Sequence, residues 1–544
     1  MDRKQCCVSL SVQPSRGQMD EKFIVLIQNA PPGFQLTVHA FHQCEDKFKW
    51  EAFGHYTADA TGTVNVSEDL SLGGTYLGVE PMGLLWSLTP VPGSKPGLMI
   101  RKLNVQTPME VTISVYQDHQ TEGFVDLVSL ASVLVERWHM APGIRRIPIT
   151  EDGLSATLFL PPGPGPFPGI LDLLGSGGML LEYRSALFAC HGFASLALDY
   201  LTNKVSIETG NFVDNKYFES AYNVLQQHPQ VLGSRIAMVG LSLGCAITFK
   251  MAVYSDVFKP PDFIIYTPGK LSFSSSIPPT LRAMLNTGKT RVNEENQIIF
   301  RDLLLPITTD TSFKADVGRL QCPLLLVVGE DDQNWPAYES AMDIKEMMEG
   351  AGNSHLLTVL SYPNTGHIIE PPFTPHTRAS NFMFAASRHK STCLWGGEKV
   401  AHSHAQEDAW RKMLLFLRKN LWAMPELHGY KVVMGPSGAP LGLTWVNQVQ
   451  HISVMTRLSR RTCTDHLRAL SALAVLRVIA SSFPLLQWIE TLDPRVYIHA
   501  DDLTEISADL PHGVLSRPVY PSAEDLPESP RTCLSVLSYI NKLP

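Results

Sequence analysis

Length, composition and charge describe an ordinary globular protein and exclude several classes of function. The 544 residues are enough for roughly two or three domains with a sizeable core, and 44% of them are hydrophobic and 18% charged. A formal charge of −8, without any basic tract, argues against nucleic acid as a partner.

Residues 1–140 are predicted to form an N-terminal β-sandwich domain. Short runs of β-forming residues alternate with turn signals such as Pro31-Pro32-Gly33, and no stretch has a long helical period. The predicted strands are 22–28, 34–42, 62–66 and 110–116. No nucleophile, base and acid come together in this region at a plausible spacing.

Residues 141–424 are predicted to form a mostly parallel sheet with helices on both faces, because strands and helices alternate from about residue 141 onward. The predicted strands are 169–174, 193–198, 236–239, 263–266, 324–328 and 356–360, and the predicted helices are 180–190, 215–227, 246–254 and 410–421. Residues 268–315 interrupt the alternation. They are either a cap over a site or a plain surface excursion.

Residues 425–544 differ in character from the rest of the chain. Residues 435–440 read as a linker, and residues 511–530 are rich in Pro, Ser, Asp and Glu, as disordered segments are. Residues 466–479 have the pattern of one amphipathic helix. We interpret this region as an extension of unknown role that is partly disordered.

The stretch 234–254 carries the first chemical signal. It reads SRIAMVGLSLGCAITFKMAVY, in which an apolar run predicts a buried strand, Gly240, Ser242 and Gly244 supply the spacing G-x-S-x-G, and an apolar helix follows. That spacing occurs by chance about 0.2 times in a chain of this length, so it is weak evidence by itself. The strand before it and the helix after it strengthen the prediction. A turn this sharp leaves no room for flanking side chains, which explains the glycines.

A serine nucleophile needs a base and a group that orients the base, in the chain order nucleophile, acid, histidine. Two later predicted strands end in the turns GEDD and SYPNTGH, where that architecture requires them. We therefore predict a triad of Ser242, Asp332 and His367, with Asp331 as the nearest rival for the acid. The alternative interpretations are a helix N-cap for Asp332 and an ordinary loop histidine for His367.

An oxyanion hole needs two donors. One is predicted to be the backbone N–H of Leu243, which follows the nucleophile. The other should come from the loop after the first parallel strand, GSGGM at 175–179, and we select Ser176 and Gly177. A phosphate-binding role for this loop is the alternative, but its spacing matches neither a P-loop nor a dinucleotide fingerprint.

Several stretches resemble the acyl-CoA thioesterase and bile acid-CoA:amino acid N-acyltransferase family. They are GGTYLGVEPMGLLW, FLPPGPGPFPGILDLLGSGGMLLEYRSALFACHGFA, VGEDDQNW, YPNTGHIIEPP and WGGEKVAHSHAQEDAW, and the resemblance covers roughly residues 1–422. It implies an N-terminal β-sandwich, an α/β-hydrolase catalytic domain, a fatty acyl-CoA substrate, and a triad on Ser242, Asp332 and His367. No cofactor is implied, since coenzyme A is part of the substrate.

Three functions compete under this resemblance. Hydrolysis of acyl-CoA thioesters is the first, and transfer of the acyl group to glycine or taurine is the second. The transferase branch of the family uses cysteine as nucleophile, so Ser242 favours water, although Cys245 lies close by in sequence. The third is an inactive acyl-CoA-binding scaffold, since family elbows often have Lys and a further Gly where this chain has Leu243 and Cys245.

The compartment is predicted from weaker signals. Nine scattered cysteines, an odd number, indicate a reducing compartment, and none has the spacing of a zinc site. The N-terminus lacks the apolar core of a signal peptide, and the most apolar late segment, 469–480, is too short to span a bilayer. We expect a cytoplasmic protein without a metal ion. The alternative is the peroxisome, because the final residues NKLP approach an S-K-L ending.

Overall fold

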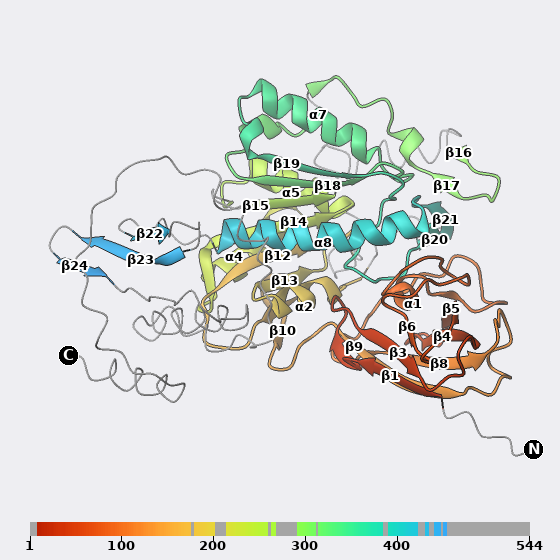
Figure 1. Cartoon of the computed structure of the whole chain (residues 1–544). Helices are drawn as coiled ribbons and strands as arrows, with labels where there is room; N and C mark the ends of the chain where they lie inside the picture. Colours follow the sequence, from red (N-terminus) through yellow and green to blue (C-terminus); the bar gives the residue numbers. More distant parts are fainter. Residues whose placement is uncertain are drawn as a thin grey trace, which may run out of the picture. The chain divides into compact units, whose positions relative to one another are not determined.

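A computed structural model describes residues 8–175, 179–201, 214–258, 263–267, 291–311, 314–383, 390–422, 430–434, 440–447 and 450–453. Figure 1 shows the order of its elements along the chain. Ser176, Gly177 and the predicted helix at 466–479 lie outside the described residues.

The N-terminal region consists of strands in two sheets, with one helical turn, α1 (Gly83–Trp86). A three-stranded sheet has the order β1-β3-β6 and a six-stranded sheet the order β2-β9-β8-β4-β5-β7. Their strands are β1 (Ser9–Gln13), β2 (Arg16–Gln18), β3 (Ile24–Gln28), β4 (Gln35–Gln43), β5 (Lys49–Thr57), β6 (Val64–Asn65), β7 (Thr89–Pro90), β8 (Met109–Gln117) and β9 (Ala131–Trp138). Both sheets contribute buried side chains to one hydrophobic cluster, which also includes residues of the later sheet and its helices. The β-sandwich itself stays a prediction.

An eight-stranded sheet follows, with the order β10-β11-β13-β12-β14-β15-β18-β19. The strands are β10 (Arg145–Ile149), β11 (Ala156–Leu160), β12 (Phe167–Leu173), β13 (Ala194–Leu198), β14 (Val231–Leu241), β15 (Phe263–Thr267), β18 (Leu324–Gly329) and β19 (Leu357–Tyr362). Within this sheet β11 runs in the opposite direction to the other strands, so its pairs with β10 and β13 are antiparallel and the remaining pairs are parallel. The predicted mostly parallel sheet is therefore confirmed, and its parallel strands end along one edge.

Helices cover both faces of this sheet, and its strands are apolar on both sides as a result. In β18, Leu325 and Val327 belong to the core that contains α8, whereas Leu324, Leu326 and Val328 belong to the core that contains α4, α5 and α7. The helices are α2 (Tyr183–Cys190), α4 (Asn215–Gln227), α5 (Leu243–Tyr254), α7 (Ala337–Gly350) and α8 (Lys399–Leu421), with short 3₁₀ turns at Glu151–Gly153, Arg301–Leu303, Val317–Arg319 and Ser354–Leu356.

Two smaller sheets complete the described residues. Strands β16 (Arg291–Val292), β17 (Ile298–Ile299), β21 (Lys390–Leu394) and β20 (Ala379–Met383) form one of them, in that order. It includes part of the segment 268–315, which was predicted to be either a cap or a surface excursion, and Phe300 from this part packs with Trp395. The other sheet, β22 (Tyr430–Met434), β23 (Pro440–Asn447) and β24 (Gln450–Ser453), lies in the predicted C-terminal extension.

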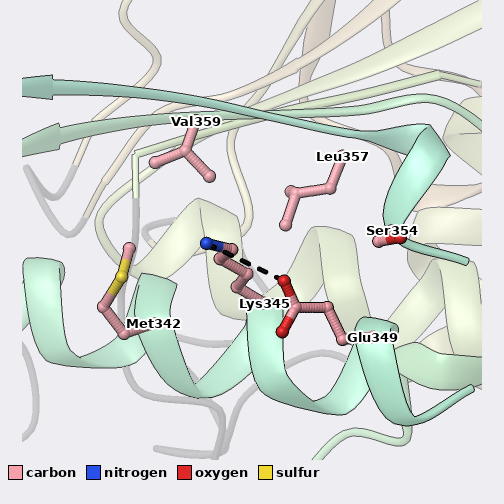
Figure 2. Close-up of a pocket in the computed structure, with 6 residues that line it drawn as sticks. All are labelled: Met342, Lys345, Glu349, Ser354, Leu357 and Val359. Atoms are coloured by element: carbon pink, nitrogen blue, oxygen red, sulfur yellow. Dashed lines mark ion pairs between the residues drawn. The ribbon is translucent and has the colours of Figure 1, made fainter.

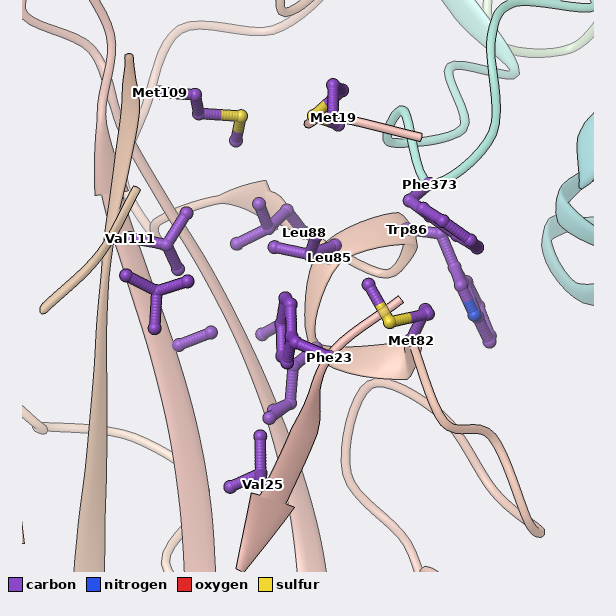
Figure 3. Close-up of a cluster of buried hydrophobic side chains, with 14 of the residues drawn as sticks. Met19, Phe23, Val25, Met82, Leu85, Trp86, Leu88, Met109, Val111 and Phe373 are labelled. Carbon is purple, nitrogen blue, oxygen red and sulfur yellow. The ribbon is translucent and has the colours of Figure 1, made fainter. Parts of the chain in front are cut away.

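The loop after β19 reaches the N-terminal core. Phe373 is 2% exposed and belongs to the same hydrophobic cluster as Trp86 of α1, and Figure 3 shows the two side chains side by side. The backbone N–H of His376 also donates a 3.3 Å hydrogen bond to the carbonyl oxygen of Trp86. The segment that contains the predicted catalytic histidine is thus packed against the N-terminal sheets.

Two helices differ from the sequence prediction. The helix predicted at 410–421 already begins at Lys399, because its first turns bury polar residues such as His402, Ser403 and Gln406, which hide the apolar period. No helix is predicted at α7, where three of the buried residues are Ala or Ser and give a weak hydrophobic signal.

Candidate active site

The predicted nucleophile occupies a strained turn between strand and helix. β14 ends at Leu241 and α5 begins at Leu243, and Ser242 between them has φ 58° and ψ −120°. Such a backbone is rare for a residue with a side chain and persists only where its surroundings enforce it. The surroundings are tight, since a Cβ on Gly244 would lie 2.0 Å from the carbonyl oxygen of Leu173 and one on Gly240 would lie 2.7 Å from the backbone nitrogen of Cys245.

The three predicted triad residues come together at the carboxyl edge of the sheet. His367 Nε2 lies 2.8 Å from Ser242 Oγ, and His367 Nδ1 lies 2.7 Å from Asp332 Oδ2. Because the carboxylate can only accept, Nδ1 carries the proton and Nε2 is the acceptor for the serine hydroxyl. Their exposed fractions are 9% for Ser242 and 2% for each of the other two, so these hydrogen bonds are shielded from water.

The two oxygens of Asp332 have different partners. Oδ2 faces His367, whereas Oδ1 accepts hydrogen bonds of 2.8 Å from the backbone N–H groups of Asn334 and Trp335. The alternative interpretation, a helix N-cap, is not what the structure shows, because the N-cap of α7 is Pro336 and Oδ1 of Asp332 instead binds the N–H groups of the turn before that helix. These two N–H groups fix the carboxylate in the orientation that His367 needs.

Asp331, the predicted rival, points elsewhere. Its Oδ2 accepts a 2.7 Å hydrogen bond from the backbone N–H of Gly397 and lies 3.3 Å from an Arg378 nitrogen, while Oδ1 accepts from the side-chain amide of Gln333. The side chain that reaches the histidine is thus that of Asp332, and Asp331 ties two turns together.

Trp395 supports His367 in a way that the sequence did not reveal. Its carbonyl oxygen accepts a 2.9 Å hydrogen bond from the backbone N–H of His367, and its ring stacks on the imidazole with centroids 5.8 Å apart. The indole N–H is itself bound 2.8 Å from Ser380 Oγ. The only sequence signal was the resemblance motif that begins at this tryptophan.

The predicted oxyanion donors are described in part. Leu243 is the first residue of α5, so its backbone N–H lies in a helix turn that offers it no intrahelical acceptor. The loop at 175–179 starts beside the nucleophile, since a Cβ on Gly175 would lie 2.9 Å from the Cβ of Ser242. The assignment of Ser176 and Gly177 stays a prediction, because both lie outside the described residues.

Cys245, the second potential nucleophile, is fully buried. It lies in α5 and belongs to the hydrophobic core that this helix forms with α4 and α7. A thiol held in this core does not share the position of Ser242 at the edge of the sheet.

A cavity of about 300 Å³ lies away from the triad, between α7 and β19. Figure 2 shows Lys345 and Glu349, both on α7, on one side of this cavity, where they form an ion pair with the charged atoms 3.8 Å apart. The lining residues are Met342, Lys345, Glu349, Ser354, Leu357 and Val359. None of them belongs to the triad, so this cavity is not part of the candidate active site.

Two features that the described part of the chain lacks bear on other functions. It contains no helix long and apolar enough to cross a membrane. It also contains no group of three or more His, Cys, Asp or Glu side chains placed to hold a metal ion.

Comparison with known proteins gives matches along most of the chain. Residues 20–151 match the family model described as "Acyl-CoA thioester hydrolase/BAAT N-terminal region", and residues 213–423 match "BAAT / Acyl-CoA thioester hydrolase C terminal". The chain is 35% identical over 422 residues to the peroxisomal succinyl-coenzyme A thioesterase of Mus musculus, covering 76% of this chain and 97% of that protein.

A second relative and a solved structure complete the comparison. The chain is 35% identical over 421 residues to the mitochondrial acyl-coenzyme A thioesterase 2 of Mus musculus, covering 76% of this chain and 89% of that protein. Among solved structures, it is similar to an α/β-hydrolase enzyme from a deep-sea metagenome library, with a TM-score of 0.31 and 13% identity, covering 51% of this chain and 97% of that chain.

Proposed function

This chain belongs to the acyl-CoA thioester hydrolase/BAAT family, and we propose that it hydrolyses fatty acyl-CoA thioesters with Ser242 as nucleophile. The observation that carries the proposal is the pair of hydrogen bonds, 2.8 Å and 2.7 Å long, that joins Ser242 to His367 and His367 to Asp332. This geometry has the parts that acyl transfer through a serine needs.

In the first half of the reaction, Ser242 Oγ attacks the thioester carbonyl carbon while His367 Nε2 takes the hydroxyl proton. Asp332 stabilises the imidazolium that forms and holds it in the correct orientation. The oxyanion binds the N–H of Leu243 and a donor of the loop at 175–179. When the tetrahedral intermediate collapses, the C–S bond breaks, His367 returns its proton to the sulfur, and an acyl-serine ester and the coenzyme A thiol remain.

In the second half, water attacks the ester carbon and gives its proton to His367. The bond to Ser242 Oγ then breaks, the serine regains its proton, and the free fatty acid leaves. The thiol is a good leaving group, since its intrinsic pKa resembles that of cysteine, about 8.5. Acylation therefore needs less help from a general acid than cleavage of an amide does.

The proposal gives water, rather than glycine or taurine, as the acyl acceptor. A thioester acyl-enzyme has weaker resonance than an oxygen ester, and amines exploit that difference more than water does. An oxygen ester on Ser242 therefore favours hydrolysis. Burial of Cys245 in the hydrophobic core supports this choice, because it keeps that thiol away from the acyl group.

The decisive experiment combines substitution, covalent labelling and product analysis. We expect Ser242→Ala to lower kcat by about 10⁵-fold to 10⁶-fold and to abolish labelling by a fluorophosphonate. Ser361→Ala is the matched control, since this exposed serine also lies at the carboxyl end of a strand of the same sheet. Full turnover by Ser242→Ala would refute the proposal, and wild-type protein that neither labels nor turns over would be the inactive scaffold.

Analysis of the products distinguishes a thioesterase from an N-acyltransferase. Long-chain and bile-acid thioesters are supplied with and without glycine or taurine, and the proposal expects free acid in all cases. An amide as the main product would identify a transferase instead. For the compartment, the expectation of a cytoplasmic enzyme is tested with tagged full-length protein, and enrichment in peroxisomes would favour the alternative.

A further inference from the structure

A second buried histidine contacts the backbone on both sides of His367. His402, in the first turns of α8, accepts a 3.1 Å hydrogen bond at Nδ1 from the N–H of Gly366. Its Nε2 donates a 2.7 Å hydrogen bond to the carbonyl oxygen of Ile368. One imidazole thus binds the residue before and the residue after the predicted general base.

The two bonds require a neutral ring with its proton on Nε2, because the carbonyl can only accept and the amide can only donate. Burial favours this state. His402 is 1% exposed, and its burial, together with nearby His376, lowers its pKa to about 3. The His376 ring stacks on His402 with centroids 4.3 Å apart and binds the carbonyl oxygen of Gly397. The His402 ring is therefore fixed in both orientation and tautomer.

The turn that contains His367 is tightly packed against the turn that precedes α8. A Cβ on Gly366 would lie 2.4 Å from the carbonyl oxygen of Gly396, and one on Gly397 would lie 2.6 Å from the nitrogen of Gly366. The N–H of Glu398, the N-cap of α8, donates a 2.7 Å hydrogen bond to the carbonyl oxygen of Asn364. The beginning of α8 and the histidine turn thus form one packed unit.

We propose that His402 is a positioning residue, which holds the backbone of Gly366 and Ile368 so that the His367 imidazole lies between Ser242 and Asp332. This inference rests on the proposed function, since it assigns His402 a part in the same reaction. A misplacement of about 1 Å in a catalytic group can lower a rate about 10²-fold. His402 does not reach the triad side chains through the bonds described here, so it acts through the loop and not on the substrate.

Four substitutions test the proposal. His402→Leu removes both bonds and keeps a side chain of similar size. His402→Asn can keep an acceptor at the Nδ1 position, and His402→Gln can keep a donor at the Nε2 position, so each retains one bond. The matched control is His404→Leu, on the same helix, because His404 is exposed and its Nε2 binds Glu80 instead.

We expect kcat to fall about 10²-fold in His402→Leu and about tenfold in the Asn and Gln variants, with KM within about twofold of wild type. The control should keep both constants. A spectroscopic readout comes from the downfield proton resonance of the His367 Nδ1–H···Asp332 bond, which should broaden or disappear in His402→Leu and persist in His404→Leu. All assays are run well below the lowest melting temperature of the set.

The outcomes distinguish this inference from the proposed function. If Ser242→Ala keeps full turnover, the proposed function fails, whereas the His367 resonance still reports whether His402 positions the loop. If the wild type is active and His402→Leu keeps both kcat and the resonance, the inference about His402 fails while the proposed function stands. It also fails if KM rises while kcat stays unchanged. If His402→Leu does not fold, the Asn and Gln variants decide by the same criteria.

Discussion

The carboxylate of Asp20 accepts a 2.9 Å hydrogen bond from the indole N–H of Trp410, although the two residues are 390 positions apart in the chain. The same oxygen lies 2.5 Å from Nε2 of His191, which caps the end of α2. The Asp20 side chain is 4% exposed. The N-terminal region, α2 and α8 are therefore joined at one buried carboxylate, on the same helix whose beginning contacts the His367 turn.

This carboxylate should contribute stability that depends on pH. Burial alone would raise the pKa of Asp20, but the hydrogen bond and the charge of His191, together with Trp410, lower it overall. A carboxyl group with a lowered pKa in the folded state stabilises the protein above its unfolded pKa, about 3.9, and loses that contribution as the pH falls through the folded pKa. We expect Asp20→Asn to lower the free energy of unfolding by about 1–3 kcal/mol at pH 7.

The measurement is the denaturant or thermal midpoint at pH 7 and at several acidic pH values. The difference between wild type and Asp20→Asn should shrink below about pH 4. Asp126→Asn is the control, because Asp126 is exposed. A difference between wild type and Asp20→Asn that stays constant down to pH 2 would show that the carboxylate charge is not the stabilising feature.

Asp332 and Asp331 should differ sharply in their effect on catalysis. In Asp332→Asn an amide would face Nδ1 of His367 and favour the wrong tautomer, so we expect kcat to fall about 10⁴-fold. Asp331→Asn can keep an acceptor for the N–H of Gly397 and should lose less than about tenfold. Steady-state kinetics of the two variants check this, and equal losses would contradict the assignment of the acid.

Gly244 should not tolerate a side chain. A Cβ there would lie 2.0 Å from the carbonyl oxygen of Leu173, so the elbow would have to shift away from β12. We expect Gly244→Ala to lower stability by about 1–3 kcal/mol and kcat by about 10²-fold or more. Gly350→Ala is the control, because nothing lies within 4 Å of its Cβ position at the end of α7. It should be neutral or slightly stabilising in the same melting and kinetic assays.

Ser242→Cys should move the product ratio towards amide when an amine is supplied. The base and the oxyanion donors stay the same, whereas the acyl-enzyme becomes a thioester, which amines attack more readily. The total rate can fall because the larger sulfur disturbs a geometry set to within about 1 Å. The quantity to measure is the ratio of conjugate to free acid at a fixed glycine or taurine concentration. An unchanged ratio would mean that the serine is not what directs the acyl group to water.

The sequence by itself determined the elements whose pattern is local. The strand, the G-x-S-x-G turn and the helix around Ser242 lie within about twenty consecutive residues, and each has its own periodicity or spacing. The two later turns follow apolar strands, so their acid and histidine could be located at the same edge of the sheet. Parallel strands impose that arrangement whatever the loops contain.

The sequence already favoured Asp332 over Asp331, but only the tertiary structure shows the different partners of the two acids and the contacts that surround His367. Asp331 and Asp332 have the same side chain but different partners. Asp331 accepts a hydrogen bond from the N–H of Gly397, 66 positions away, whereas Asp332 contacts His367. His402 lies 36 positions from Gly366. Hydrogen bonds between such distant residues produce no periodic pattern in the sequence. The buried polar residues that make them also interrupt the apolar spacing, so the first turns of α8 cannot be predicted from that spacing.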